Sequence, residues 1–278
     1  NYTDKSLVEY FFVGKKSNYT KIPITNYDVI DNNIFYTSLS TNIKKKYNGK
    51  YKIVEQTFWF GTDRFGRDLL SRIIYGVRVS IAVGLIAVII SLIIGISLGL
   101  IAGFYRGRVD DIIMWFVNVI WSIPTLLMVI AITLALGKGF WQVFVAVGLT
   151  MWVEVARIVR GQVMAIRELE YVEASKVLAY SPFRIITKHI LPNVIGPVIV
   201  ISAANFAAAI LIEAGLSFLG IGAQPPIPSW GSIIKDHYSY IIMDKAYLAI
   251  IPGIAIMLLV LSFMTIGNSL RDAFDVRD

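Results

Sequence analysis

The chain carries few of the residue types that catalysis or metal binding requires. It has no cysteine and only two histidines, His189 and His237, so disulfides, thiolate nucleophiles and cysteine metal sites are excluded. Neither H-E-x-x-H nor G-x-S-x-G occurs. Lys138 lies in a Gly-Lys-Gly sequence, but Ile132 and Gly139 stand where a phosphate-binding loop needs Gly and Ser or Thr. We predict no catalytic residue, metal site or bound cofactor, and any ATP-driven work must use another subunit.

Three residues within long apolar runs are candidates for lining a transport path: Pro124, Asn205 and Glu213. Pro124 removes a backbone hydrogen bond in mid-span and predicts a kink, although packing alone also explains it. Asn205 and Glu213 are about two helical turns apart and therefore share a face. An acid within a membrane span is costly and is a functional candidate by default. Glu213 either lines the path or anchors the loop that follows it.

Glu154, Arg157 and Arg160 form a second charged group, spaced three residues apart. This spacing predicts one helix face near the membrane boundary, with an i,i+3 ion pair and arginines that extend to the polar surface.

These residues must be positioned by membrane helices. The chain has 278 residues, of which 56% are hydrophobic and 16% charged, and its mean hydropathy is +0.66. A membrane helix needs roughly 20 apolar residues. Five runs meet or approach that length: 79–105, 112–137, 140–163, 190–212 and 246–270. The sequence predicts an all-α polytopic membrane protein.

The basic residues predict the orientation of these spans. Thirteen of the 26 Lys and Arg lie before residue 79, and the others lie mainly at the ends of apolar runs, which favours membrane topology over nucleic-acid binding. Beyond residue 79, ten lie on one side and three on the other, so we expect the segment 171–197 and the C-terminus to be cytoplasmic. Residues 1–72 are then extracytoplasmic. An odd number of spans also predicts a sixth helix upstream of Asn1.

Residues 1–60 differ from the rest of the chain. They are polar and rich in Asn, Tyr and Lys, with strand-like pieces such as 51–54. We expect a small extracytoplasmic segment here and a transmembrane domain over 61–278.

The segment 171–197 separates two apolar runs and is charged and rich in small residues. Glu173, Ala174 and Ser175 begin a predicted short amphipathic helix. The small side chains allow close approach to another surface, and Glu173 is able to pair with a basic partner. Pro182 should end this helix, and Pro192 should break or bend the start of the next. The alternative is an ordinary cytoplasmic loop.

Two further segments are expected at the opposite side. In 61–72, Thr62 or Asp63 is expected to cap a helix and Gly66 to permit a turn. The alternative is that this segment shapes an outer mouth, for which the candidate residues are Asp63, Arg67, Asp68 and Trp230. Trp230 belongs to the proline-rich loop 224–231, for which scaffolding is the alternative.

Small residues also recur every fourth position in the first span, at Ser91, Gly95, Gly99 and Gly103. They predict close helix packing, within the chain or against a second subunit.

Together these motifs resemble the C-type permease subunit of the dipeptide/oligopeptide ABC importers. The resemblance covers roughly residues 60–278 and includes G-T-D-x-x-G-R-D at 61–68, S-I-P at 122–124, E-A-G-L-S-F-L-G at 213–220 and Q-P-P-x-P-S-W-G at 224–231. It identifies 171–197 as the ATPase-coupling segment, whose matching positions are Glu173, Ala174, Ser175, Ala179, Leu191 and Pro192. The chain departs from the family pattern at Ser175, Ala179 and His189, which replace Ala, Gly and Ile.

The resemblance implies one half of a pore that imports peptides across a bacterial or archaeal plasma membrane. Expected partners are membrane lipid, a B-type permease, two cytoplasmic ATPases that carry ATP and Mg, and an extracytoplasmic binding protein. In the path, Glu213 would meet a peptide's amino terminus. Nickel or another small solute is an alternative cargo. An ion-coupled transporter that uses Glu154 and Glu213 is an alternative of another class, but it has no need of a docking helix.

Overall fold

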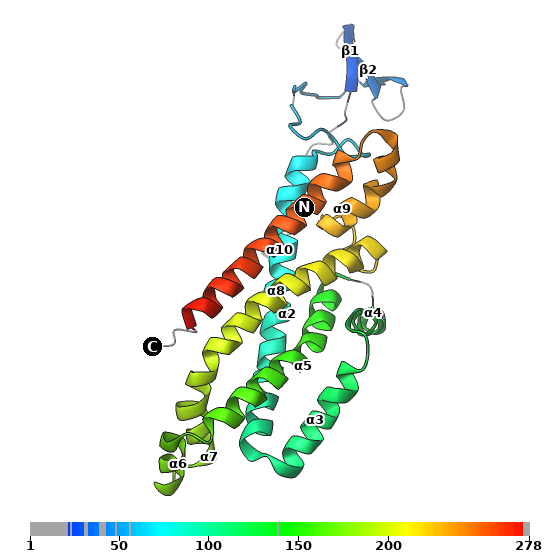
Figure 1. Cartoon of the computed structure of the whole chain (residues 1–278). Helices are drawn as coiled ribbons and strands as arrows, with labels where there is room; N and C mark the ends of the chain where they lie inside the picture. Colours follow the sequence, from blue (N-terminus) through cyan, green and yellow to red (C-terminus); the bar gives the residue numbers. More distant parts are fainter. Residues whose placement is uncertain are drawn as a thin grey trace.

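The computed structural model is an elongated bundle of helices with a small sheet at one end and two short helices, α6 and α7, at the other (Figure 1). It describes residues 22, 24–30, 33–38, 43–47, 49–55, 57–137 and 139–274. Four helices there are long and apolar enough to cross a membrane, and a bent pair supplies a fifth crossing if it counts as one span. The all-α membrane fold is confirmed, whereas the sixth span upstream of Asn1 stays a prediction.

The first long helix, α2, spans Leu69–Tyr105. It begins ten residues before the predicted span, because Arg72 and Arg78 interrupt the apolar run without interrupting the helix. Its N-cap is Asp68, whose carboxylate accepts hydrogen bonds from the backbone N–H groups of Leu70 and Ser71. The expectation of a cap at Thr62 or Asp63 was therefore wrong.

The second predicted span is two helices. α3 spans Gly107–Trp121 and α4 spans Thr125–Leu136, and the pair is bent by 90°. Pro124 occupies the N-cap of α4, where its missing N–H interrupts no helical hydrogen bond. The predicted kink at Pro124 is confirmed, and it is a complete break that sets α4 across the bundle (Figure 1).

The centre of the bundle is the contact between α2 and α5, which spans Phe140–Ile166. A Cβ added to Gly95, Gly99 or Gly103 would lie 2.6 to 2.7 Å from atoms of α5. The small face predicted in the first span therefore packs within the chain, which decides between the two alternatives. The facing valines of α5 are fully buried: Val155, Val159 and Val163.

After α5 come α6, Glu170–Val177, and α7, Pro182–Ile185. α7 continues through a π-helical turn, Ile186–Ile190, into α8, Leu191–Leu219, so that Pro182 begins one 38-residue span. Of the two predicted effects of Pro192, a break is excluded because the span is continuous, whereas a distortion of the helix start is present as the π turn directly before it. In the π turn the Leu191 N–H donates to the carbonyl of Ile186, five residues earlier. The next residue is Pro192, which has no N–H.

At the sheet end of the bundle, α9 covers Trp230–His237 and is followed by a 3₁₀ turn, Tyr238–Met243. The last helix, α10, spans Tyr247–Phe274 and agrees with the predicted run 246–270. It packs on α8, where the rings of Phe206 and Phe263 stack with centroids 3.9 Å apart.

The small sheet consists of three antiparallel strands in the order β1-β2-β3. β1 is Ile24–Ile30, β2 is Asn33–Ser38 and β3 is Lys44–Tyr47. The strand expected at 51–54 was wrong, because these residues have no regular secondary structure. All four are exposed.

Candidate functional site

Of the six predicted coupling residues, four lie on α6 or in the turn that ends it, and Leu191 and Pro192 lie at the start of α8. Glu173 and Ala174 are exposed, whereas Ser175 faces the protein and donates its hydroxyl to the carbonyl of Tyr171 at 2.8 Å. Ala179 has a positive φ of 57°, with its N–H bonded to Lys176 and the next N–H bonded to Ser175. This is a Schellman C-cap, whose left-handed position usually holds glycine. The position where the importer resemblance expects Gly is therefore one that strains Ala.

Large apolar side chains are exposed on α6, on α7 and in the turn between them, beside the charged residues Glu170, Glu173 and Lys176. Val177 is 87% exposed, Leu178 64% and Phe183 76%. With Glu173 and Ala174 these residues form what we call the coupling surface. Such a concentration of exposed large apolar side chains at one end of the molecule is typical of a protein contact.

The coupling surface is rigidly joined to the long helices. Val172 of α6 and Ile185 of α7 are buried in one cluster with Phe104 of α2 and Val163 of α5. Leu191 packs against the same cluster, whereas Pro192 is exposed. Polar contacts tie the neighbouring helix ends, with Arg106 paired to Glu168 at 2.7 Å and Arg167 donating to the carbonyl of Phe104 at 2.7 Å.

A cavity of about 290 Å³ lies between the α3–α4 break, α5 and α8. Its apolar walls include Trp121, Met128, Met151 and Ile212, and its polar side chains are Thr125, Thr150, Glu154 and Asn205. Asn205 is 2% exposed, and its Nδ2 has no hydrogen-bond partner in the described part of the chain. Of the three predicted path residues, Asn205 is the one that lines this cavity. Pro124 lies at the break between two lining residues.

Glu213 is placed differently from Asn205. Its side chain is buried, and its Oε1 accepts the hydroxyl of Ser217 at 2.6 Å. The same hydroxyl oxygen accepts the Ala223 N–H at 3.1 Å, which fixes the loop after α8. The structure thus favours anchoring of the loop, and Glu213 does not line the cavity.

The charged residues of α5 contact α3. Arg160 binds Asp110 through two hydrogen bonds of 2.5 and 2.6 Å, and Arg157 donates to Asn118 at 2.6 Å and lies over the ring of Trp121. The predicted i,i+3 ion pair with Glu154 was wrong, because both arginines face another helix. Glu154 lies at the middle of α5 rather than near its end.

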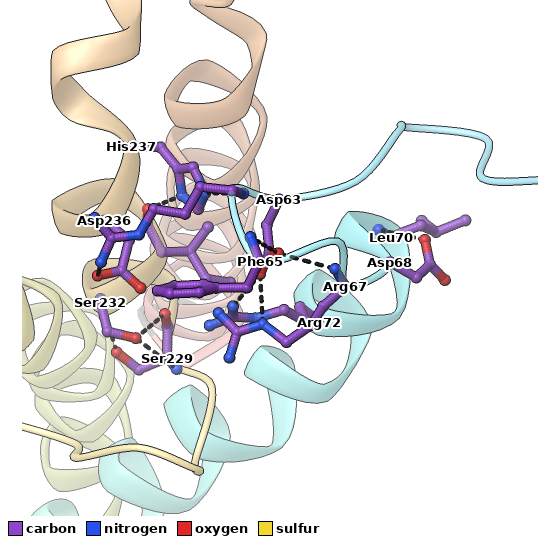
Figure 2. A network of polar contacts seen from close by, with 12 residues as sticks. Asp63, Phe65, Arg67, Asp68, Leu70, Arg72, Ser229, Ser232, Asp236 and His237 are labelled. Carbon is purple, nitrogen blue, oxygen red and sulfur yellow. Dashed lines mark hydrogen bonds and ion pairs between the residues drawn. The ribbon is translucent and has the colours of Figure 1, made fainter. Parts of the chain in front are cut away.

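Two of the expected outer-mouth residues, Asp63 and Arg67, belong to one network of polar contacts at the sheet end (Figure 2). The Asp63 carboxylate is buried and accepts the N–H groups of Phe65 at 2.8 Å and Arg67 at 2.9 Å, the Arg67 side chain at 2.6 Å, and Arg72. Burial alone would raise the pKa of Asp63, but these hydrogen bonds outweigh it and hold the pKa below its usual range.

This network also holds α9 to α2. The Arg64 side chain pairs with Asp236 at 3.1 Å, and the Arg64 backbone N–H donates to Nε2 of His237. The other ring nitrogen of His237, Nδ1, lies 2.7 Å from the carbonyl oxygen of Ile233. These two contacts assign the neutral tautomer with the proton on Nδ1. Trp230 is buried and donates to the carbonyl of Ile73 at 2.9 Å.

Arg72, Asp236 and His237 are parts of this network that were not among the predicted site residues. Arg72 lies in the segment 61–72, for which a helix cap or an outer mouth was expected. Asp236 and His237 contact Arg64 from more than 170 positions away in the chain, and no local pattern signals such a contact.

Residues 95–277 match the family described as "Binding-protein-dependent transport system inner membrane component". The chain belongs to this family, which defines it as the membrane-embedded subunit of a transport system. The resemblance to peptide-importer permeases is also confirmed. The dipeptide transport system permease protein DppC of Bacillus subtilis (strain 168) is 42% identical over 217 residues, covering 78% of this chain and 68% of that protein.

Other relatives and solved structures agree. The oligopeptide permease OppC of the same Bacillus strain is 39% identical over 78% of this chain and 71% of its own length. The glutathione permease GsiD of Pectobacterium atrosepticum is 39% identical over 78% and 72%. The MetNI methionine ABC transporter in an inward facing conformation matches with a TM-score of 0.61 at 18% identity, covering 74% of this chain and 97% of that chain, which shows the shared fold.

Proposed function

We propose that this chain forms half of the translocation path of an ATP-driven importer of short peptides. The observation that carries the proposal is the joining of two sites by continuous helices. The coupling surface lies at one end of the molecule, and the cavity around Asn205 is enclosed by α5 and α8, the helices that flank the coupling segment. The relatives named for dipeptide, oligopeptide and glutathione transport support peptides as the cargo.

In this mechanism the coupling surface docks on one of two cytoplasmic ATPase subunits. Those subunits bind ATP and Mg, since this chain has no phosphate-binding loop. α7 and α8 belong to one continuous helical span, and Val172 of α6, Ile185 of α7 and Val163 of α5 pack in one hydrophobic cluster. Movement of α6 therefore displaces α5 and α8 together. The cavity between these helices then opens to alternate sides of the membrane.

The remaining partners follow from the same arrangement. A B-type permease supplies the other half of the path and covers part of the exposed apolar helix surface, and lipid covers the rest. The sheet end is extracytoplasmic and receives peptide from a binding protein. The four residues expected at the outer mouth shape it indirectly: Trp230 holds α9 against the start of α2, Asp63 and Arg67 order the loop before α2, and Asp68 caps α2.

The test begins with gentle purification of the tagged protein from its membrane. We expect a second permease and two ATPase subunits to copurify, and the complex to take up peptide with ATP and binding protein. Recovery of the chain alone, with transport driven by an ion gradient without ATP, would contradict the proposal.

Coupling is tested with Glu173→Lys, which reverses the charge on the coupling surface. We expect uptake and peptide-stimulated ATPase activity to be lost while the protein stays in the membrane. Asp272→Lys is the matched control, because Asp272 is exposed in the last turn of a different helix, α10. Normal uptake by the Glu173 variant would remove the coupling role.

A further inference from the structure

The cavity lies at the middle depth of the bundle. Glu154 is near the centre of α5, and Asn205 is near the centre of the antiparallel helix α8. Each lies roughly 20 Å from the ends of its helix. The volume of about 290 Å³ suits one end of a short peptide rather than a whole peptide.

Glu154 is the titratable side chain among the residues that line this cavity. No ion pair to Glu154 occurs within the residues that the structure describes. The nearest cation along its helix, Arg157, is engaged by Asn118 and by the ring of Trp121. An acid at mid-membrane depth without a cationic partner is costly to retain for structure alone and indicates a functional contact.

Two other features favour a cation beside Glu154. α3 ends at Trp121 on the cavity wall, and the C-terminal end of a helix carries partial negative charge. Glu154 is exposed to the cavity opening, and the apolar side chains around it lower the local dielectric, which strengthens attraction between opposite charges. Asn205 adds a buried amide that lines the same cavity and whose Nδ2 is unpartnered among the described residues, as expected of a group that bonds to a ligand.

We propose that Glu154 binds the free α-ammonium group of a peptide during translocation, with Asn205 bonding to the adjacent peptide carbonyl. Glu154 is thus a specificity-determining residue of the path. It contacts the amino terminus of the peptide, a role that was expected for Glu213. The proposal rests on the proposed function and names the chemical group that the path recognises.

The test uses the complete importer in proteoliposomes, with its binding protein supplied at saturation. The probes are labelled trialanine and N-acetyl-trialanine, and the affinity of the binding protein for each is measured first. Glu154→Gln removes the charge with little change in size, Glu154→Asp keeps the charge, and Asp272→Asn is a control at an exposed acid outside the cavity.

We expect Glu154→Gln to lower trialanine uptake at least about tenfold, because a charge-assisted contact is lost. Glu154→Asp should retain most uptake, and Asp272→Asn should match the wild type. Uptake of N-acetyl-trialanine should be equal in Glu154→Gln and the wild type. Thermal stability and the ATPase activity stimulated by empty binding protein should be unchanged in Glu154→Gln, which separates recognition from folding.

Equal trialanine uptake in Glu154→Gln and the wild type would overturn the inference. A loss that affects both peptides equally would also overturn it, because the ammonium group would then be irrelevant. If the binding protein does not bind N-acetyl-trialanine, the test rests on trialanine uptake by Glu154→Gln and Glu154→Asp. Equal uptake by these two variants would then overturn the inference. Failure of the wild-type importer to take up any peptide would contradict the proposed function instead.

Discussion

Replacement of Asp63 by Asn should destabilise the outer end of the molecule by about 3 kcal/mol. The two carboxylate oxygens have different partners: Oδ1 accepts the N–H groups of Phe65 and Arg67, whereas Oδ2 accepts the guanidinium groups of Arg67 and Arg72. Asparagine keeps the first pair but turns an NH₂ donor toward two cations. The Arg67 side chain is 45% exposed and can return to water, but Arg72 is 14% exposed and loses its partner in a buried site. Most of the cost therefore arises at Arg72.

The assay is amide hydrogen exchange in the purified complex, read by mass spectrometry on a peptide covering 61–72. Asp63→Asn should raise the exchange rate of this peptide and leave α5 unchanged. Asp68→Asn is the matched control: it also replaces one accepting oxygen, but its partners Leu70 and Ser71 are neutral and no arginine loses its partner, so the change should be about 1 kcal/mol or less. Unchanged protection in the Asp63 variant, or equal losses in the two variants, would refute the assignment of the Asp63 network as the clamp of this end.

Three further outcomes are expected. Because the pKa of Asp63 is lower in the folded protein, its ionisation contributes stability above the unfolded-state pKa of about 3.9, and this stability is lost as pH falls through the lower folded-state pKa. Protection of residues 61–72 from hydrogen exchange should therefore fall only below about pH 4. Asp63→Asn should abolish this pH dependence. Gly99→Leu should lower the melting temperature of the complex strongly, since an added Cβ lies 2.7 Å from a main-chain oxygen of α5, whereas Gly161→Ala, with nothing within 4 Å, should not. Ala179→Gly should relieve a positive φ and stabilise the end of α6 by about 1 kcal/mol, measured as slower exchange there; faster exchange would contradict the strain.

Local patterns in the sequence predicted the elements well. The apolar runs located all the long helices because a membrane span requires about 20 apolar residues whatever its neighbours are. Their ends were less accurate, since a helix such as α2 continues through Arg72 and Arg78 into the polar region. The break at Pro124 was also predictable, because the lack of an N–H is a property of that residue alone. Its angle of 90° was not, since packing sets the direction of α4.

The sequence alone determined that this chain spans a membrane, and it predicted a coupling segment and ATPase sites on other subunits, because these inferences depend on composition and on short motifs. The tertiary structure decided which residues meet. Arg160 binds Asp110, which is fifty positions away in the chain. Glu213 binds Ser217 and so anchors the loop after α8, whereas Glu154 and Asn205 line one cavity. Such pairings depend on how separate helices rotate and cross, and the periodicity within any one helix carries no information about that.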